Sequence, residues 1–248
     1  MPIVRSLLFN IAFWCWTIVL AVLALPLLAL PPRVMAAYGR FWSRGVQALL
    51  QILVGLTYET RGLEHAAAAR PAIFAVKHQS AWETLVLLLV LPDARTALKR
   101  ELTQIPLFGW CCLHAGMIRI DRGGAARAMR SLIEGARRAL ADGLSVIIFP
   151  EGTRVRPGEH RPYLPGVAAL YLHLHRPVVP VALNSGLFWP RRAFIKRPGR
   201  IVLEFLPPIE PGLTRAAFMT ELARRLEAGT DRLLAEATVE PVAARGDA

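Results

Sequence analysis

A long stretch without charge near the N-terminus constrains this chain more than any other feature. Residues 6–32 contain no Asp, Glu, Lys or Arg, and a helix of that length, rising about 1.5 Å per residue, can cross roughly 30 Å of bilayer hydrocarbon. A cleaved signal peptide would have a shorter apolar core and a small-residue cleavage site before a polar start. We therefore expect an N-terminal membrane element, and Pro26 near its end allows a bent hairpin as well as a span.

The next segment, residues 33–57, has the pattern of an amphipathic helix. Its arginines alternate at helical spacing with an apolar set that comprises Phe41, Trp42, Val46, Leu49, Leu50 and Leu53. Arg33, Arg40 and Arg44 follow the apolar run, whereas Arg5 alone precedes it. Because basic residues favour the cytoplasmic side of a membrane, we expect an inner-membrane protein whose following domain faces the cytoplasm.

Composition indicates an anionic partner. The 248 residues include 30 Lys and Arg against 18 Asp and Glu, a formal net charge of +12, and 54% of them are hydrophobic. A basic surface attracts nucleic acid, anionic lipid headgroups or phosphorylated substrates. Zinc-finger spacing and RNA-binding motifs are missing, so we expect membrane lipid and no nucleic acid. The three cysteines cannot form a disulfide framework, which favours a reducing compartment.

Beyond residue 62 apolar strands alternate with amphipathic helices. Strands are expected at 72–76, 94–99, 116–120, 145–149, 178–183 and 201–205, and helices at 81–91, 125–140 and 214–237. This alternation predicts an α/β fold with a mostly parallel central sheet flanked by helices. We divide the chain into membrane-anchoring helices at 1–60, an α/β domain at 61–240 and a flexible tail at 241–248.

The first polar cluster follows the strand expected at 72–76. His78 lies at the carboxyl end of that strand, where open α/β sheets bind ligands, and Glu83 follows in the next helix. An imidazole with a reference pKa of about 6.5 can accept a hydroxyl proton near neutral pH, and a carboxylate can fix its tautomer. Alternatively, Ser80 and Glu83 form a capping box at the start of that helix. Both interpretations stay open, and Lys77 is expected at a solvated strand end.

The second cluster is Phe149-Pro150-Glu151-Gly152-Thr153-Arg154, also at a strand end. Arginine can bind a phosphate with two parallel hydrogen bonds, which makes Arg154 a candidate ligand-binding residue. Gly152 allows close backbone approach or a positive φ. The alternative is an ordinary turn with exposed charges, just as Arg119 and Asp121 could form a surface ion pair of small energetic value.

Four blocks in order resemble the glycerolipid acyltransferase family, which includes bacterial 1-acylglycerol-3-phosphate acyltransferases. They are His78 to Glu83, similar to the family's HxxxxD; 116–122, similar to GxIxIDR; the FPEGTR word at 149–154; and an apolar proline block at 178–182. The chain departs from the family pattern by having Glu83 in place of Asp, and Pro165 where a lysine is common.

The resemblance implies a function and assigns site residues. It implies acyl transfer from acyl-CoA or acyl carrier protein to a lysophospholipid hydroxyl, most simply that of 1-acylglycerol 3-phosphate, by direct attack without metal or cofactor. His78 and Glu83 would be catalytic, and the substrate-binding residues would be Lys99, Arg119, Arg122, Glu151, Gly152, Thr153 and Arg154. Alternatives are another lysophospholipid or lyso-aminolipid acceptor, a hydrolase, or a non-catalytic basic membrane-binding protein.

Overall fold

The computed structural model describes residues 2–121 and 123–243. Arg122, a predicted site residue, and positions 244–248 of the predicted tail therefore lie outside the described residues. The strands are β1 (Leu56–Arg61), β2 (Ile73–Val76), β3 (Ala94–Lys99), β4 (Ile118–Ile120), β5 (Ser145–Ile148), β6 (Val178–Leu183) and β7 (Gly199–Phe205). The α-helices are α1 (Pro2–Leu23), α2 (Pro32–Leu49), α3 (Leu63–Ala68), α4 (Trp82–Val90), α5 (Arg100–Thr103), α6 (Phe108–His114), α7 (Ala125–Ala141), α8 (Pro165–Leu174) and α9 (Arg215–Ala243). Shorter helical turns are η1 (Pro26–Ala29), η2 (Leu50–Val54) and η3 (Ser185–Leu187).

In the described part of the chain, seven strands form one sheet in the order β1-β7-β6-β2-β5-β3-β4. Every neighbouring pair is parallel except β6 and β7, which are antiparallel. The α/β fold with a mostly parallel sheet is therefore confirmed. β2 lies between β5 and β6, so the carboxyl ends of these three strands meet at one edge of the sheet.

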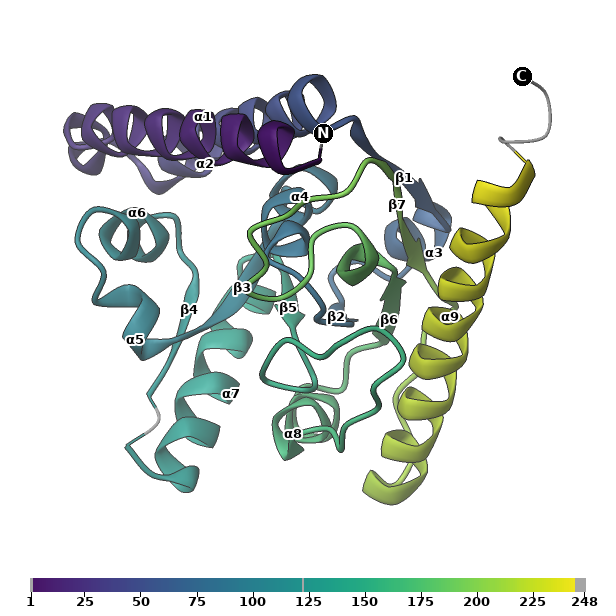
Figure 1. Cartoon of the computed structure of the whole chain (residues 1–248). Helices are drawn as coiled ribbons and strands as arrows, with labels where there is room; N and C mark the ends of the chain where they lie inside the picture. The colour runs from purple at the N-terminus through teal and green to yellow at the C-terminus, as the bar shows by residue number, and fades with distance from the viewer. Residues whose placement is uncertain (1, 122, 244–248) are drawn as a thin grey trace.

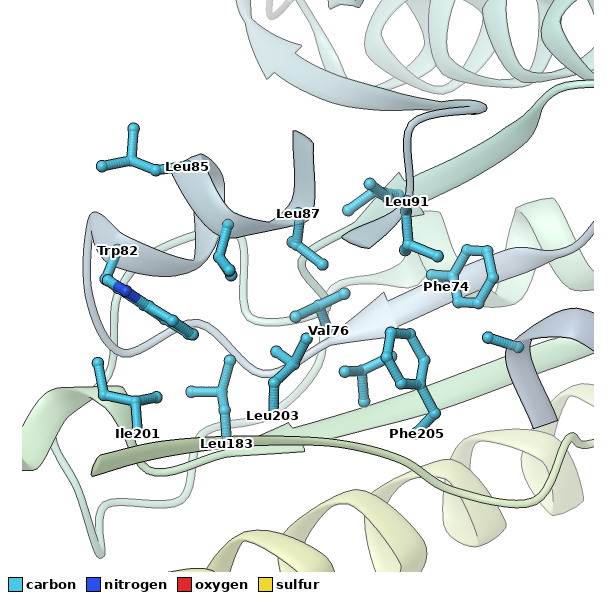
Figure 2. Packing of buried hydrophobic residues seen from close by; sticks show 14 of the residues in the cluster. Phe74, Val76, Trp82, Leu85, Leu87, Leu91, Leu183, Ile201, Leu203 and Phe205 are labelled. Atoms are coloured by element: carbon cyan, nitrogen blue, oxygen red, sulfur yellow. The ribbon is translucent and has the colours of Figure 1, made fainter. Parts of the chain in front are cut away.

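Alternate residues of β2 face opposite sides of the sheet, because successive side chains in a strand point in opposite directions. Phe74 and Val76 pack with Trp82, Leu87 and other residues of α4 in one cluster (Figure 2). Ile73 and Ala75 pack with residues of α7, α8 and α9 in the other. The next residues continue the alternation, which sends Lys77 towards α9 and His78 towards α4.

The N-terminal helices α1 and α2 form a hairpin that lies across α4 on the first of these faces (Figure 1). Tyr38 donates a hydrogen bond to the Leu20 carbonyl at 2.8 Å, and Trp16 Nε1 donates to the Trp42 carbonyl at 3.1 Å. Ser43 Oγ donates to the Leu85 carbonyl at 2.8 Å, which ties the hairpin to the body of the protein. Most of α1 stays exposed, and this helix is long and apolar enough to cross a membrane.

Most predicted elements match the structure within a few residues, and those at 94–99 and 178–183 match in full. The sequence analysis missed β1, which pairs with β7 and starts before the predicted domain boundary at residue 60. That boundary stays a prediction. The predicted helices at 214–237 are one helix, α9, which continues to Ala243 and so into the segment predicted as a flexible tail.

Close packing inside the hairpin makes a prediction about stability. A Cβ atom on Gly45 would lie 2.4 Å from the Trp16 ring, which is held by its hydrogen bond to Trp42. Gly45→Ala should therefore lower the thermal midpoint of the detergent-solubilised protein, with a cost of about 1–3 kcal/mol. Gly39→Ala in the same helix is the control. Its Cβ would meet nothing within 4 Å, so it should be neutral or stabilising, and equal midpoints for both variants would contradict the packing argument.

Candidate functional site

The candidate site lies where β2, β5 and β6 end. β2 continues into Lys77 and His78, β5 into the turn that contains Glu151 and Gly152, and β6 into η3, which begins at Ser185. Three segments that are far apart in the sequence are thus brought to one edge of the sheet, because the three strands are parallel neighbours. Ligands of open α/β sheets bind at this edge.

His78 and Glu83 form the predicted pair. His78 Nδ1 lies 2.9 Å from Glu83 Oε1, and the two side chains are 12% and 0% exposed. Because Nδ1 faces the carboxylate, Nε2 is the ring nitrogen left for a ligand, and no polar group of the described residues bonds to it. This geometry would hold the tautomer in which Nε2 can accept a proton.

The Glu83 carboxylate also accepts three other hydrogen bonds. The backbone N–H groups of Gln79 and Ser80 each donate to Oε1 at 2.7 Å, and Ser185 Oγ donates to Oε2 at 2.8 Å. Ser80 Oγ in turn accepts the Trp82 N–H at 3.1 Å. The capping contact and the histidine contact, predicted as alternatives, are therefore present together on the same side chain.

Phe149 packs against one face of the His78 ring. The His78 and Phe149 rings are stacked, with centroids 4.1 Å apart and planes inclined by 22°. Val155 N–H donates to the His78 carbonyl at 2.7 Å, so the loop after β5 is fastened to the strand end that carries the histidine. The two sequence motifs that were recognised separately are in direct contact.

Arg154 is half-buried close to this pair. Burial lowers the pKa of its guanidinium, Glu83 acts in the opposite direction, and the positive charges of Arg191 and Arg192 lower the pKa further. Glu83 lies beyond ion-pair distance, so Arg154 has no carboxylate partner among the described residues. An unpaired guanidinium beside a candidate catalytic histidine is suited to bind an anionic substrate group.

Lys77 is buried rather than solvated, which corrects the sequence-based expectation. Its side chain is 1% exposed, and Nζ donates to both carboxylate oxygens of Glu227 in α9 at 2.7 Å. Tyr163 donates to the same carboxylate at 2.5 Å. These charges lie on the opposite face of the sheet from His78, as the alternation along β2 requires.

Glu151, a predicted substrate contact, points into this buried cluster. Its side chain is 0% exposed, and Oε1 lies 3.1 Å from Lys77 Nζ, without hydrogen-bonding geometry. Burial raises the pKa of Glu151, although the charge of Lys77 opposes the shift. Glu151 therefore supports the turn from the face of the sheet opposite His78. Contact between its carboxylate and an acceptor stays an untested prediction.

The remaining predicted binding residues lie in the turn after β5, at the end of β3 and on β4. Gly152 has φ 62° and closes the turn by donating its N–H to the Phe149 carbonyl at 2.9 Å, and Thr153 is half-buried beside it. Lys99 ends β3 on the far side of β5 from His78, and Arg119 is exposed on the edge strand β4. Asp121 contacts Arg100 and Arg127, so the alternative of a surface pair between Asp121 and Arg119 is not formed.

An apolar cavity of about 190 Å³ lies between the N-terminal hairpin and the body of the protein. Thr84, the residue after Glu83, is part of its wall, so helix α4 contributes both to the cavity and to the candidate site. The wall is drawn from the hairpin, α4, β3 and α6, and includes Leu20, Met35, Gly39, Leu88, Leu98 and Cys112. A cavity with such a wall is suited to a hydrocarbon chain.

Sequence reasoning missed two residues that hold the site together, Ser185 and Glu227. Ser185 follows the apolar block at 178–182, so its place at a strand end was a usable signal. Glu227 shows no comparable signal, because it lies on the helical surface of α9 at 150 residues from Lys77.

Comparisons with known proteins identify the family of this chain. The family model described as Acyltransferase matches residues 57–184. A 1-acyl-sn-glycerol-3-phosphate acyltransferase of Pseudomonas aeruginosa is 34% identical over 204 residues, which cover 82% of this chain and 78% of that protein. The 1-acyl-sn-glycerol-3-phosphate acyltransferase alpha of Mus musculus is 31% identical over 215 residues, covering 83% and 73%.

The fold is shared with a solved structure. The crystal structure of the 1-acyl-sn-glycerophosphate acyltransferase PlsC of Thermotoga maritima superposes with a TM-score of 0.77 and covers 95% of this chain and 98% of its own. The two sequences are 21% identical, so this likeness supports the fold.

The buried state of Glu151 predicts a pH dependence of stability. A carboxyl group whose pKa is raised by folding contributes stability below its unfolded pKa, and this contribution is lost as the pH rises through the folded value. The usual pKa is 4.5, so the thermal midpoint of the wild type should fall relative to that of Glu151→Gln as the pH rises above this value. Glu159→Gln, which removes a half-buried carboxylate that pairs with Arg161 in the same loop, should not remove the slope. If the difference in thermal midpoint between the wild type and Glu151→Gln is the same at every pH, the assignment is contradicted.

Proposed function

Because this chain belongs to the acyltransferase family, we propose that it transfers a fatty acyl group from a thioester to the free hydroxyl of a lysophospholipid. The observation that carries the proposal is the His78–Glu83 pair, which leaves Nε2 available at the sheet edge where ligands bind. A half-buried arginine near the pair, and an apolar cavity lined by the same helix that carries Glu83, suit the two ends of such an acceptor.

In the proposed mechanism His78 acts as the general base. Nε2 takes the proton of the acceptor hydroxyl while its oxygen attacks the thioester carbonyl carbon, and Glu83 stabilises the imidazolium that forms. The tetrahedral intermediate then expels the thiolate, and the imidazolium returns the proton to that sulfur. The hydroxyl attacks directly, so the chain forms no acyl-enzyme, and these steps require no metal or cofactor.

The most economical acceptor is 1-acylglycerol 3-phosphate, and the product would then be phosphatidic acid. The names of the relatives from Pseudomonas aeruginosa and Mus musculus support this choice, and the unpaired guanidinium of Arg154 supports a phosphorylated headgroup. Another lysophospholipid or lyso-aminolipid is the alternative, since Glu83 and Pro165 depart from the family pattern.

The proposed location is the inner membrane, with the sheet domain on the cytoplasmic side. The exposed apolar surface of α1 supports insertion into lipid, and the arginines of α2 support this orientation. The donor would be acyl-CoA or acyl carrier protein, both of which are available in the cytoplasm. Membrane lipid is thus the expected partner, and nucleic acid is not.

In the proposed mechanism acyl transfer depends on the His78 imidazole and the Glu83 carboxylate, and substitution of each residue tests this. Purified protein in detergent is incubated with labelled acyl-CoA and a panel of lysolipids. His78→Ala should lose at least about 100-fold in kcat, because general-base catalysis contributes roughly that much. Glu83→Gln should lose activity while Glu83→Asp retains part of it. Equal activity in Glu83→Gln would contradict the pair, and fatty acid release without an acceptor would favour a hydrolase.

The cavity predicts acyl-chain selection. Gly39 belongs to its wall, and a Cβ atom there would meet nothing within 4 Å, so a larger side chain can enter the empty space. Gly39→Leu should shorten the preferred acyl chain by about two carbons, measured by competition between acyl-CoA donors of different length. Ala37→Leu, at an exposed position of the same helix, is the control. An unchanged chain profile in Gly39→Leu would exclude this cavity as the acyl site.

A further inference from the structure

The segment between η3 and β7 carries an arginine pair that no sequence motif identified. Residues 160–203 contain no acidic residue, and within them Arg191 and Arg192 are adjacent and exposed. Arg191 Nη1 donates to the Arg154 carbonyl at 3.0 Å, so the pair lies directly against the loop after β5. Three guanidinium groups from two loops thus gather at the mouth of the candidate site.

These three cations have no carboxylate within ion-pair distance among the described residues. Like charges that gather without a counter-charge repel one another, and this repulsion is relieved when an anion binds between them. Several other arginines of this chain do have a carboxylate partner, for example Arg61 with Glu59 and Arg232 with Glu204. The uncompensated cluster therefore indicates an anion-binding site.

The segment is fixed at both ends, so the arginine pair is held in place before a ligand arrives. At one end Ser185 donates to Glu83, and Gly186 packs so closely against Pro157 that a Cβ atom would lie 2.8 Å from its ring. Trp189, just before the arginine pair, packs edge-on against Phe9 of α1, with ring centroids 5.5 Å apart. At the other end Lys196 Nζ donates to Asn10 Oδ1 of the same helix at 2.6 Å.

The backbone of Arg192 supports a functional reason for this arrangement. Its φ of 59° lies in the left-handed region, which a residue other than glycine occupies at a cost of about 1–2 kcal/mol. The chain has arginine at a position where glycine would relieve that cost. Strain of this kind is enriched at ligand-binding sites, although Leu107 and His175 also have positive φ in this structure.

From these observations we infer that Arg191 and Arg192 join Arg154 in binding the terminal phosphate of the acceptor, and that they select a phosphomonoester over a phosphodiester headgroup. The inference rests on the proposed function. A phosphomonoester carries about 1.5 to 2 negative charges at neutral pH because its second pKa is about 6, whereas a diester carries one. Three guanidinium groups complement the more highly charged group better.

Steady-state kinetics with two acceptors tests the inference. For Arg191→Ala/Arg192→Ala, the KM for 1-acylglycerol 3-phosphate should rise about tenfold, which corresponds to partial loss of exposed charge contacts. The KM for lysophosphatidylglycerol, a diester, should change by less than about twofold, and kcat and the KM for acyl-CoA should stay near wild type. Arg192→Gly should raise the acceptor KM without lowering the thermal midpoint, because it removes the guanidinium and relieves the backbone strain together.

The matched control is Arg197→Ala, an exposed arginine in the same segment that does not contact Arg154. It changes the net charge equally and should leave both acceptor KM values unchanged. An unaltered KM for 1-acylglycerol 3-phosphate in the double variant would overturn the inference, as would a rise in KM confined to acyl-CoA, whose phosphates are the rival ligand. Failure of the proposed function looks different, since the wild type would then acylate no lysolipid at all.

Discussion

The structure depends on one buried charge, the carboxylate of Glu83. A carboxylate that is fully removed from water needs several donors, because its desolvation is otherwise prohibitive. Here two backbone N–H groups, Ser185 and the His78 ring supply them. The same four contacts fix the start of α4, the end of β2 and the segment after β6. One residue thereby sets the position of the histidine and of the loop that carries the arginine pair.

The alternation of side chains along β2 separates the chemistry from its support. His78 stacks on Phe149 and faces the same side of the sheet as the hairpin and α4, which line the apolar cavity. Lys77 faces the other side and joins Glu151 and Glu227 in a buried cluster that connects both strand ends to α9. Removing one charged residue of such a cluster leaves an unpaired buried charge, which is costly. The cluster therefore favours the arrangement in which the ends of β2 and β5 stay side by side.

The sequence was sufficient wherever the deciding contacts are local. The strand at 178–183 and the contact of His78 with Glu83 follow from apolar patterning and from residues five positions apart. The sequence does not reveal which distant residues pair: Ser185 could be placed at a strand end, but its contact with Glu83, 102 residues away, could not be predicted, and Glu227 lies 150 residues from Lys77. Lys77 was expected in solvent for the same reason, since nothing near it in the sequence shows that a helix covers that face. Strand β1 was missed because its pattern continues that of the preceding helix.

The shared wall of the cavity has a practical consequence. The hairpin supplies one side of that wall. Gln47 of the hairpin also accepts a hydrogen bond from Trp82 Nε1 of α4 at 2.9 Å. The hairpin is therefore part of the core of the protein as well as its proposed anchor. A truncated, water-soluble catalytic fragment that begins after Val54 would lay open the apolar side of α4, including Leu85 and Leu88, to solvent. Such a fragment would aggregate, so biochemical work on this protein requires the intact chain in detergent or lipid.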